Sequence, residues 1–331
     1  MKQEMLKLID DFPNARILCV GDIMLDKFVQ GRVERISPEA PVPVFQFIQE
    51  RQMLGGAGNV VANLKSLSSY TYFVGLSGKD KHGDDVSALL SQIHAEYYLI
   101  RSKLRQTIMK ARYIAGTQHI LRFDQEKIMP LTELEETELL MVIARHINDV
   151  DCVVLSDYGK GIFTPSSTRK IIEMAKETKK RVLIDPKGRD YSKYAGAFLI
   201  KPNRKELQEA TNMILEPTSV DFLKDLSVAA HKILDEYAIE NMIITLSEKG
   251  MLYVPRSSQA KEVYLPTAAK EVYDVSGAGD TSVAVIGIAL SCGATIEEAM
   301  TLANTAAGVV VGKVGTATLT TQELRQKIDT K

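Results

Sequence analysis

The sequence predicts an α/β protein with a doubly wound, mostly parallel sheet flanked by helices and a small β-sheet lid. Strand-length apolar runs without alternation recur between segments with helical spacing, as in parallel sheets buried on both faces. Two other segments alternate apolar and polar residues, as exposed antiparallel strands do. With 331 residues and 45% hydrophobic content, the chain can bury a large core. We expect a single domain over residues 1–331.

The main sheet is predicted from five short runs rich in β-branched residues. They cover residues 17–20, 152–155, 181–184, 197–200 and 242–246. Segments with apolar residues at helical spacing lie between them, at residues 60–67, 139–147 and 171–175. Because strands and helices alternate along the chain, we expect the doubly wound arrangement.

The lid is predicted from residues 28–48 and 97–123, which alternate apolar and polar side chains. Pro38, Pro41 and Pro43 confine the first segment to a sheet edge, because proline cannot donate a ladder hydrogen bond. Such a small sheet has an apolar face that can close over a substrate or pair with a second subunit.

Composition excludes several classes of protein. Lys and Arg number 41 against 42 Asp and Glu, so no overall field attracts nucleic acid or an anionic membrane, and we expect neither partner. Cys19, Cys152 and Cys292 are far apart and lie in apolar runs, which favours buried thiols in a reducing cytoplasm. The longest apolar stretch, residues 283–290, is too short to span a bilayer.

The strongest local motif is DVSGAGDT at residues 274–281, followed at once by an apolar, helix-like run. Its glycines allow a ligand to approach the backbone, and the free N–H groups and dipole of the helix start favour an anion. A transferring phosphoryl group is such an anion. Asp280 can accept the proton of an attacking hydroxyl, or it can simply cap the helix, and both interpretations stay open.

Three further groups of polar residues have two interpretations each. The turn LGGAGN at residues 54–59 either brings Asn59 to a ligand or packs against a strand, and it lacks the dinucleotide fingerprint. Asp22 and Asp26 follow the first strand, where they can bind sugar hydroxyls or be solvated turn residues. Asn203 and Glu206 can form a capping box or hold a Mg²⁺-bound phosphate through water.

Other catalytic motifs are missing from the sequence. The five histidines lack zinc-ligand spacing, and neither a G-x-S-x-G elbow nor a Walker A sequence is present. Zinc chemistry, a serine hydrolase and a P-loop nucleotidase are therefore not favoured.

In combination, GGAGN at 55–59, N-x-x-E at 203–206 and GAGD at 277–280 resemble the ribokinase-like (PfkB) carbohydrate kinases in order and spacing. The resemblance covers essentially the whole chain. Within the family it is strongest to kinases of D-glycero-β-D-manno-heptose 7-phosphate. The segments that carry this similarity are residues 35–44, 155–158, 184–188, 271–274 and 306–313.

The resemblance implies that ATP phosphorylates the anomeric hydroxyl of the heptose 7-phosphate. The product would be the 1,7-bisphosphate, a precursor of ADP-heptose for the lipopolysaccharide core. Three alternatives remain: another sugar or nucleoside kinase of the family, a nicotinamide-dependent oxidoreductase suggested only by the α/β pattern, and a non-catalytic sugar-binding protein. The implied cofactors are ATP and Mg²⁺, with K⁺ as a further candidate, although Val275 stands where many relatives have Thr.

The resemblance also implies roles for individual residues. Asp280 would be the base, and Gly277, Ala278 and Gly279 would form the anion hole. The nucleotide and its magnesium would be held by Asn203, Glu206, Ser247, Gly250 and Asn304, with Glu206 reaching Mg²⁺ through water. The sugar would be contacted by Asp22, Asp26, Gly55, Gly56, Asn59 and Asp185. The lid would form a homodimer contact.

A substrate that already carries a phosphate needs cations at the far end of its pocket, because charge-assisted contacts are the strong ones. Lys110 and Arg112 lie on a predicted lid strand, and Lys187 and Arg189 follow a strand of the main sheet. These four residues are candidates for a clamp on the phosphate, and the alternative is that they are solvated surface cations.

Overall fold

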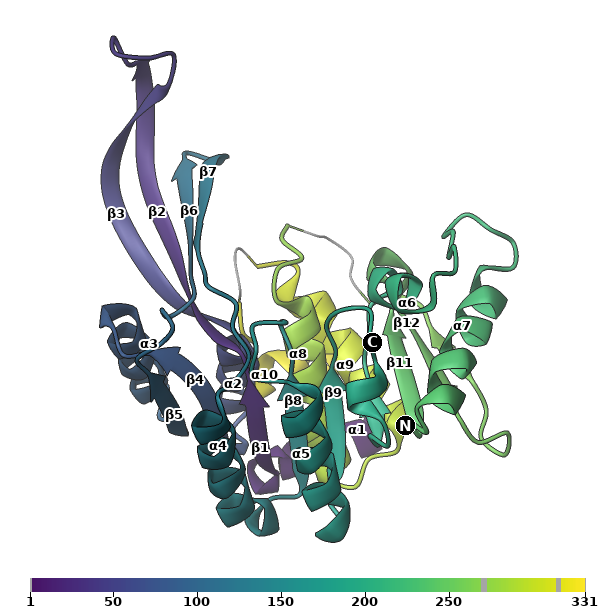
Figure 1. Ribbon diagram of the computed structural model, residues 1–331. Helices are drawn as coiled ribbons and strands as arrows, with labels where there is room; N and C mark the ends of the chain where they lie inside the picture. The colour runs from purple at the N-terminus through teal and green to yellow at the C-terminus, as the bar shows by residue number, and fades with distance from the viewer. Residues whose placement is uncertain (1, 269–272, 314–316, 331) are drawn as a thin grey trace.

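The computed structural model describes residues 2–268, 273–313 and 317–330. It contains a nine-stranded sheet with the strand order β13-β12-β11-β10-β9-β8-β1-β4-β5 and a separate four-stranded sheet. Helices cover both faces of the large sheet, and the small sheet projects from one end (Figure 1). The predicted α/β fold with a lid is confirmed.

Seven neighbouring strands of the large sheet run parallel, and two antiparallel strands extend one edge. The parallel strands are β1 Arg16–Gly21, β4 Tyr70–Gly78, β5 Glu96–Ser102, β8 Cys152–Ser156, β9 Arg181–Asp185, β10 Leu199–Ile200 and β11 Asn241–Thr245. The antiparallel strands are β12 Met251–Pro255 and β13 Val263–Leu265. All five strands predicted from apolar runs are found, because each is buried on both sides.

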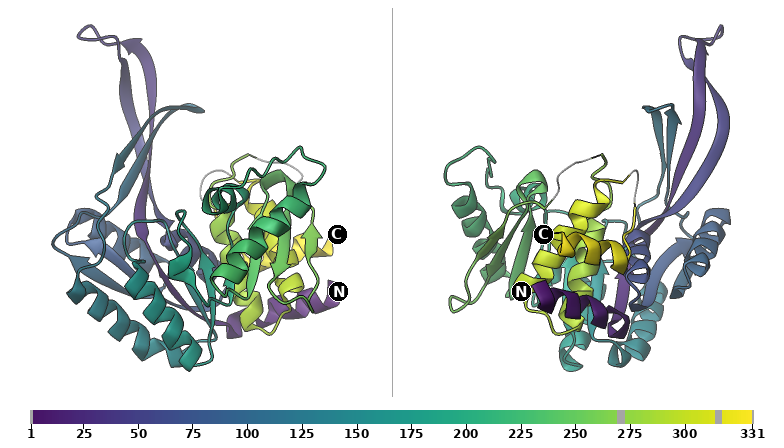
Figure 2. Two further views of the ribbon diagram at one scale, coloured as in Figure 1. Left: turned by 45° about the vertical axis from the view of Figure 1, so that its right-hand side comes forward. Right: turned by 180° about the vertical axis from the view of Figure 1, so that it is seen from behind.

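The helices form two layers, and each layer packs against the main sheet through its own buried apolar cluster. The first layer contains α1 Lys2–Asp11, α2 Ala57–Ser66, α3 Lys81–Gln92, α8 Ala278–Ser291, α9 Ile296–Val310 and α10 Thr321–Asp329. The second contains α4 Glu133–His146, α5 Pro165–Glu177, α6 Arg204–Thr211 and α7 Phe222–Glu236. Figure 2 shows the layer with α1, α9 and α10 from behind. Short 3-10 turns occur at Phe12–Asn14, Ile147–Asp149, Ser192–Tyr194 and Ser247–Lys249.

The lid consists of a long antiparallel hairpin and a shorter one. The strands are β2 Ile23–Ile36, β3 Pro43–Gly56, β6 Met109–Ala115 and β7 Gln118–Gln125, in the order β3-β2-β6-β7. Strand β6 runs parallel to β2. Pro43 begins β3, which is the edge strand that the prolines predicted. Pro38 and Pro41 lie in the connecting loop.

One boundary of the predicted lid is wrong. Residues 97–102 belong to β5, which pairs in parallel with β4 at the edge of the main sheet. The alternation of apolar and polar residues that predicted a lid strand belongs instead to an edge strand of the main sheet, in which Glu96 and Tyr98 are exposed and Ile100 and Ser102 are buried. Such an edge strand and an exposed antiparallel strand give the same sequence pattern.

Helix α8 is buried along nearly its whole length, between the main sheet and helices α2 and α9. Its close approach to β8 depends on Gly287, where a Cβ would lie 3.1 Å from Val154 Cγ2. A helix that is apolar all round is expected in such a central position. The packing places the start of α8, with Asp280, at the edge where the parallel strands end, which is where ligands bind in open α/β sheets.

Two predictions from composition can be compared with the structure. Cys19 and Cys152 are buried free thiols, whereas Cys292 is only half-buried. Within the ranges that the structure describes, no helix combines the length and the apolar character needed to cross a membrane.

Candidate active site

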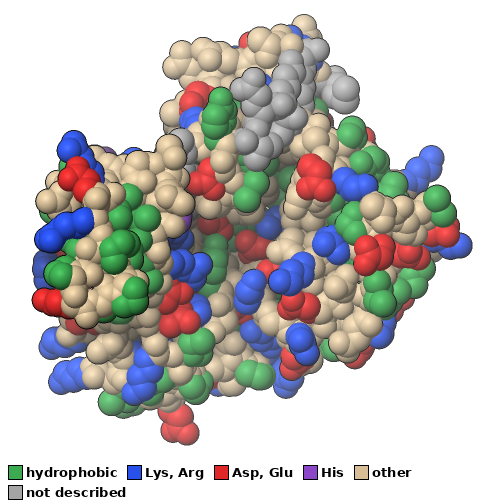
Figure 3. Space-filling view, turned by 90° about the horizontal axis from the view of Figure 1, so that it is seen from above, with side chains coloured by type: hydrophobic (Ala, Val, Ile, Leu, Met, Phe, Trp, Pro, Cys, Tyr) green, Lys and Arg blue, Asp and Glu red, His purple; other side chains and the backbone are tan. Residues whose placement is uncertain are grey.

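Five parallel strands, β1, β8, β9, β10 and β11, end at the same edge of the sheet, and polar residues follow or end four of them. Asp22 follows β1, Asp157 and Tyr158 follow β8, Asp185 ends β9, and Lys201 follows β10. Figure 3 looks down on this side of the molecule and shows a hollow in which acidic and basic side chains gather. A cavity of about 190 Å³ lies here, lined by Asp157, Tyr158, Asp185, Pro186, Lys187, Lys201, Asn203, Glu206, Thr245, Gly277, Gly279 and Asp280.

The start of α8 faces this cavity. Gly277 is the N-cap residue with φ +82°, a conformation that favours glycine, and it accepts a hydrogen bond from the Thr281 N–H at 2.9 Å. The capping alternative for Asp280 is therefore wrong, because Asp280 is the third residue of the helix. At Gly279 an added Cβ would meet only the Lys201 Nζ, at 3.8 Å, so the backbone is open to a ligand. First-turn amides have no acceptor within the helix and can bind an anion, but here the Ala278 N–H also donates to the Val275 carbonyl oxygen at 3.3 Å.

Asp280 is buried, and both of its carboxylate oxygens accept hydrogen bonds. The Tyr158 hydroxyl donates to Oδ1 at 2.5 Å, and Asn59 Nδ2 donates to Oδ2 at 2.7 Å. Burial raises the pKa of Asp280 to about 6, and the hydrogen bond from Tyr158 is the largest effect that opposes this rise. A carboxylate with a pKa close to neutral is suited to act as a general base.

The glycine-rich turn brings Asn59 to Asp280, and the contact of Asn59 with a ligand stays a prediction. Gly55 and Gly56 serve the packing alternative instead. A Cβ at Gly55 would lie 2.4 Å from Asp26 Oδ2, and a Cβ at Gly56 would lie 2.5 Å from the Asp22 carbonyl oxygen. Both glycines therefore allow the end of β3 to lie close to the start of β2, at the base of the lid.

A second layer of hydrogen bonds fixes Asn59. Asn63 Nδ2 donates to the Asn59 carbonyl oxygen at 2.9 Å, and Thr281 Oγ1 donates to Asn63 Oδ1 at 2.9 Å. The network connects α2 with α8, and its members are buried. Buried polar networks with satisfied members hold side chains in one geometry.

Lys201 is a buried cation beside the start of α8. Its Nζ forms an ion pair with Asp185 Oδ1 at 2.8 Å. Burial lowers the pKa of Lys201, but the adjacent Asp185 carboxylate outweighs that effect and the pKa is raised overall. The ammonium group therefore stays charged close to Gly279, where it can attract a phosphate.

Asn203 and Glu206 form a capping box at the start of α6. The Glu206 N–H donates to Asn203 Oδ1 at 2.9 Å, and the Asn203 N–H donates to Glu206 Oε2 at 3.0 Å. Lys187 Nζ binds the other oxygen of Glu206 at 2.8 Å. Both interpretations of this motif remain compatible with the structure, because the capping pair also lines the cavity.

A second cavity, of about 390 Å³, adjoins the first and shares Asn203, Thr245 and Gly279 with it. Its other walls are Ser247, Glu248, Gly250, Met251, Thr267, Val275, Ala278, Ser282, Asn304, Ala307, Gly308 and Val311. Four of the five residues predicted to hold the nucleotide, Asn203, Ser247, Gly250 and Asn304, therefore lie around one space, whereas Glu206 lines the first cavity only.

Three residues of this second cavity have distinct local structure. Ser247 has φ +53°, a value that glycine adopts more readily, although the residue is serine. Gly250 has φ +92°, and a Cβ there would lie 2.0 Å from the Leu265 carbonyl oxygen. Asn304 Nδ2 donates to the Pro266 carbonyl oxygen at 2.7 Å and so connects α9 to the segment after β13.

Asp22 is predicted to bind the sugar, and its partners among the described residues are backbone groups of the loop after β8. The Asp22 carboxylate accepts hydrogen bonds from the backbone N–H groups of Tyr158, Lys160 and Ile162, at 3.0, 3.0 and 3.3 Å. Burial raises the pKa of Asp22 to about 6. Its carboxylate holds the loop after β8.

The four cations of the expected phosphate clamp are not together. Arg112 Nη1 forms an ion pair with Asp26 Oδ1 at 2.8 Å in the lid, whereas Lys187 is paired with Glu206 beside α6. Arg189 is exposed. Lys110 is half-buried on β6. The predicted clamp is therefore divided between two parts of the molecule.

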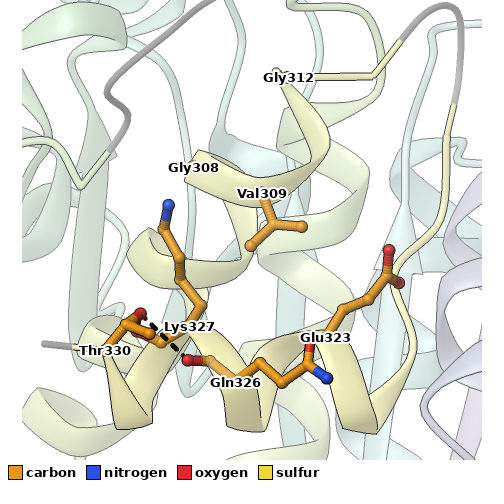
Figure 4. A pocket seen from close by; sticks show the side chains of 7 residues that line it. All are labelled: Gly308, Val309, Gly312, Glu323, Gln326, Lys327 and Thr330. Carbon is orange, nitrogen blue, oxygen red and sulfur yellow. Dashed lines mark hydrogen bonds between the residues drawn. The ribbon is translucent and has the colours of Figure 1, made fainter.

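Outside this centre lie a cavity of about 450 Å³ beside the start of α7 and two others. One, of about 730 Å³, extends from the lid strands to residues 273–276 and is lined by Phe28, Gln30, Gln49, Glu50, Arg51, Met53, Arg112, Ile114, His119, Tyr273, Asp274 and Ser276. The other, of about 490 Å³, lies between α9 and α10 (Figure 4) and contains none of the predicted site residues.

The segment 271–274 of the resemblance is only partly visible, because residues 271 and 272 lie outside the described ranges. Tyr273 and Asp274 donate backbone hydrogen bonds to Val311.

A glycine-capped helix start beside a buried carboxylate, with a nucleotide-sized cavity adjoining it, defines a phosphotransferase of the ribokinase-like class. The chain belongs to the pfkB family of carbohydrate kinases, whose family model matches residues 14–323. As a member of a carbohydrate kinase family, the chain does not fit the nicotinamide-dependent oxidoreductase alternative.

Curated relatives and solved structures agree with this assignment. The chain is 42% identical over 319 residues to the bifunctional protein HldE of Rhodospirillum rubrum, and 44% identical over 322 residues to HldE of Paramagnetospirillum magneticum. These matches cover 96% and 97% of this chain, but only 63% and 64% of the relatives. Escherichia coli phosphofructokinase-2 with potassium is similar in fold, with a TM-score of 0.76 at 20% identity, over 95% of this chain and 99% of that one. Arabidopsis thaliana ribokinase in complex with ribose and ATP is also similar in fold. Its TM-score is 0.74 at 19% sequence identity, and the match covers 95% of this chain and 98% of the ribokinase chain.

Two residues of the centre were not predicted as site residues. Tyr158 and Lys201 lie directly after strands β8 and β10, so their position at a strand end was the available signal. Tyr158 stands next to Gly159, in a turn that was not considered as a site motif. Only the order of strands in the sheet brings them to Asp280.

Proposed function

We propose that this sugar kinase transfers a phosphate from ATP to the anomeric hydroxyl of D-glycero-β-D-manno-heptose 7-phosphate, giving the 1,7-bisphosphate. The observation that carries the proposal is the Asp280 carboxylate in the first turn of α8, held on both oxygens by Tyr158 and Asn59. The relatives named HldE and the sequence segments that resemble heptose kinases support the choice of sugar. The reaction would supply ADP-heptose synthesis, and we place it in the cytoplasm.

In this mechanism Asp280 accepts the proton of the sugar hydroxyl while that oxygen attacks the terminal phosphorus of ATP. The bond from that phosphorus to the ADP oxygen breaks, and ADP leaves. The amides of Gly277, Ala278 and Gly279 and the ammonium group of Lys201 stabilise the negative charge on the phosphoryl oxygens. ATP occupies the cavity that contains Ser247, Gly250 and Asn304 and extends towards Gly279.

Magnesium fits this site only through water. The carboxylate of Glu206 faces the cavity, but its oxygens are already bound by Lys187 and by the Asn203 N–H. In the described ranges, no group of three or more Asp, Glu, His or Cys side chains can hold a metal. Mg²⁺ would neutralise phosphate charge, with Glu206 as an outer contact. K⁺ remains part of the proposal without an assigned site.

The terminal phosphate of the substrate is best placed at Lys110. This half-buried side chain has no ion pair among the described residues, whereas its neighbours Lys160 and Arg122 are paired with Glu126 and Asp124. Burial lowers the pKa of Lys110, and the charges of Lys160 and Arg122 lower it further. A phosphate dianion would compensate this excess of positive charge. Lys187 is not assigned to the phosphate, because its ammonium group already forms an ion pair with Glu206.

A coupled assay of ADP release tests the choice of substrate. Purified protein with ATP and Mg²⁺ is expected to turn over heptose 7-phosphate far faster than fructose 6-phosphate, ribose or a nucleoside. A preference for one of the other acceptors would assign the chain to another kinase of the same family.

The Lys110→Ala variant tests the phosphate contact. We expect the KM for heptose 7-phosphate to rise roughly 10-fold or more, because a charge-assisted hydrogen bond contributes about 1.5–3 kcal/mol. The KM for ATP should stay the same. Lys224→Ala, which removes an exposed lysine of α7, is the control and should change neither value. An unchanged KM for the sugar in Lys110→Ala would remove this contact from the proposal.

A further inference from the structure

We propose that Tyr158 is a positioning residue for the phosphoryl transfer, which orients the carboxylate of Asp280, and that Asp22 holds Tyr158 in place through the loop after β8. The inference rests on the proposed role of Asp280 as the base. It gives a function to two residues that do not lie in the glycine-rich motifs.

The Asp280 carboxylate is held by donors from two different parts of the fold. Tyr158 reaches Oδ1 from the loop after β8, at 2.5 Å, and Asn59 reaches Oδ2 from α2, at 2.7 Å. A hydroxyl–carboxylate contact of this length is of the strong, charge-assisted kind. With one donor on each oxygen, the plane of the carboxylate is fixed and each oxygen keeps a lone pair for the sugar hydroxyl.

The loop that presents Tyr158 is itself anchored on both sides. Asp22 accepts the backbone N–H groups of Tyr158, Lys160 and Ile162. Asp157, the residue before Tyr158, accepts hydrogen bonds from Lys193 Nζ at 2.6 Å and from the Tyr194 hydroxyl at 2.7 Å. A loop held in this way keeps its side chains in one geometry.

Asp22 is a buried carboxylate, and its bonds to the loop explain why it is there. An aspartate without partners in this place would be strongly unfavourable, and three N–H donors offset part of the cost of its burial. Asp22 is thus connected to Asp280 through Tyr158, although it does not line the cavity.

The hydroxyl of Tyr158 donates and does not take the substrate proton. Burial, together with the charge of Asp280, raises the pKa of Tyr158 well above its usual value, so the phenol stays protonated. Its hydrogen bond favours the ionised form of Asp280 and lowers the pKa of that carboxyl against the effect of burial. Without this donor, Asp280 would remain protonated up to a higher pH.

The Tyr158→Phe variant is the test, with kcat measured from pH 5 to 9 on whichever sugar the wild-type protein phosphorylates. We expect kcat at pH 7 to fall roughly 10–100-fold, and the acid limb of the profile to move up by about one pH unit or more. The affinity for ATP, measured by equilibrium binding, should not change.

Tyr253→Phe is the matched control, since it also removes a buried tyrosine hydroxyl bond, from Tyr253 to Asn241 Oδ1 in the main sheet. Its acid limb should coincide with that of the wild type. If Tyr158→Phe lowers kcat equally at every pH, or leaves it unchanged, the positioning role is wrong.

A second variant keeps the test valid if Tyr158→Phe does not fold. Fluorotyrosine at position 158 preserves the shape and is a stronger donor, so the acid limb should move to lower pH, and an unmoved limb would overturn the inference. Failure of the proposed base is recognised separately, because Asp280→Asn would then retain its kcat.

Discussion

At the scale of single residues, Asp280 combines two conflicting requirements. It must be buried to lie beside the phosphate, yet it must be ionised to accept a proton. The hydrogen bonds from Tyr158 and Asn59 and the nearby charge of Lys201 keep its pKa at about 6 despite burial. These contacts reconcile the two requirements near neutral pH.

The Asp280→Asn variant tests the chemical role of this residue. We expect kcat to fall by about 10²–10⁴, the usual range for the loss of a positioned base, because asparagine cannot accept the proton. The affinity for ATP should be retained, since the backbone of α8 is unchanged. Steady-state kinetics together with ATP binding measure both quantities. A kcat close to that of the wild type would show that Asp280 is not the base.

The residues that sequence could identify are those in local motifs. Asp280, Asn203 and Gly250 stand in patterns whose chemistry is visible over a few positions. Tyr158 and Lys201 could not be assigned in this way, because their proximity to Asp280 depends on the strand order of the sheet. The contacts of Asp22 could not be predicted for a related reason: its partners are backbone groups more than 130 residues away.

At the scale of elements, the lid combines predictable and unpredictable features. Alternation and prolines predicted its strands and its edge. The same alternation misplaced residues 97–102, which form the edge strand β5 of the main sheet. The sequence pattern reports that one face of a strand is buried, but not which sheet contains the strand.

The lid exposes large apolar side chains, and we propose that it pairs with a second copy of the chain. Ile36, Phe47 and Ile48 of the long hairpin are more than half exposed, at 60%, 65% and 52%. The hairpin projects away from the helical layers (Figure 2). Apolar exposure of this kind marks interaction surfaces.

The Phe47→Asp variant tests this dimer, because a buried unpaired charge strongly weakens an apolar interface. Light scattering after size-exclusion chromatography should show a dimer for the wild type and a monomer for the variant. Val220→Asp is the control, since Val220 is fully exposed on a loop outside the lid and its replacement should leave the dimer intact. A monomeric wild-type protein would contradict the proposal.

At the scale of the whole molecule, the polar centre opposes stability at neutral pH. Burial raises the pKa of both Asp22 and Asp280 from about 3.8 to about 6. For a carboxyl with a raised pKa, the folded state is favoured most below the unfolded value and loses this advantage as pH rises through the folded value. The unfavourable contribution of each group is therefore complete above about pH 6.

This sign gives a prediction for the free energy of unfolding. At pH 7.5 Asp280→Asn should be more stable than the wild type by roughly 1–3 kcal/mol. The reason is that a folded-state pKa about two units above the unfolded value corresponds to about 3 kcal/mol. The difference should shrink towards pH 4, where the wild-type carboxyl is protonated. Chemical denaturation at several pH values measures it. A difference that does not depend on pH would show that the ionised carboxylate is not destabilising.

The central claim is that the start of α8 receives the transferred phosphate while Asp280 accepts the proton of the sugar. A crystal structure with a non-hydrolysable ATP analogue and the sugar acceptor tests it most directly. We predict the terminal phosphate at the amides of Gly277–Gly279 and the acceptor hydroxyl within about 3 Å of the Asp280 carboxylate. A terminal phosphate bound away from α8, or an acceptor hydroxyl out of reach of Asp280, would contradict the mechanism.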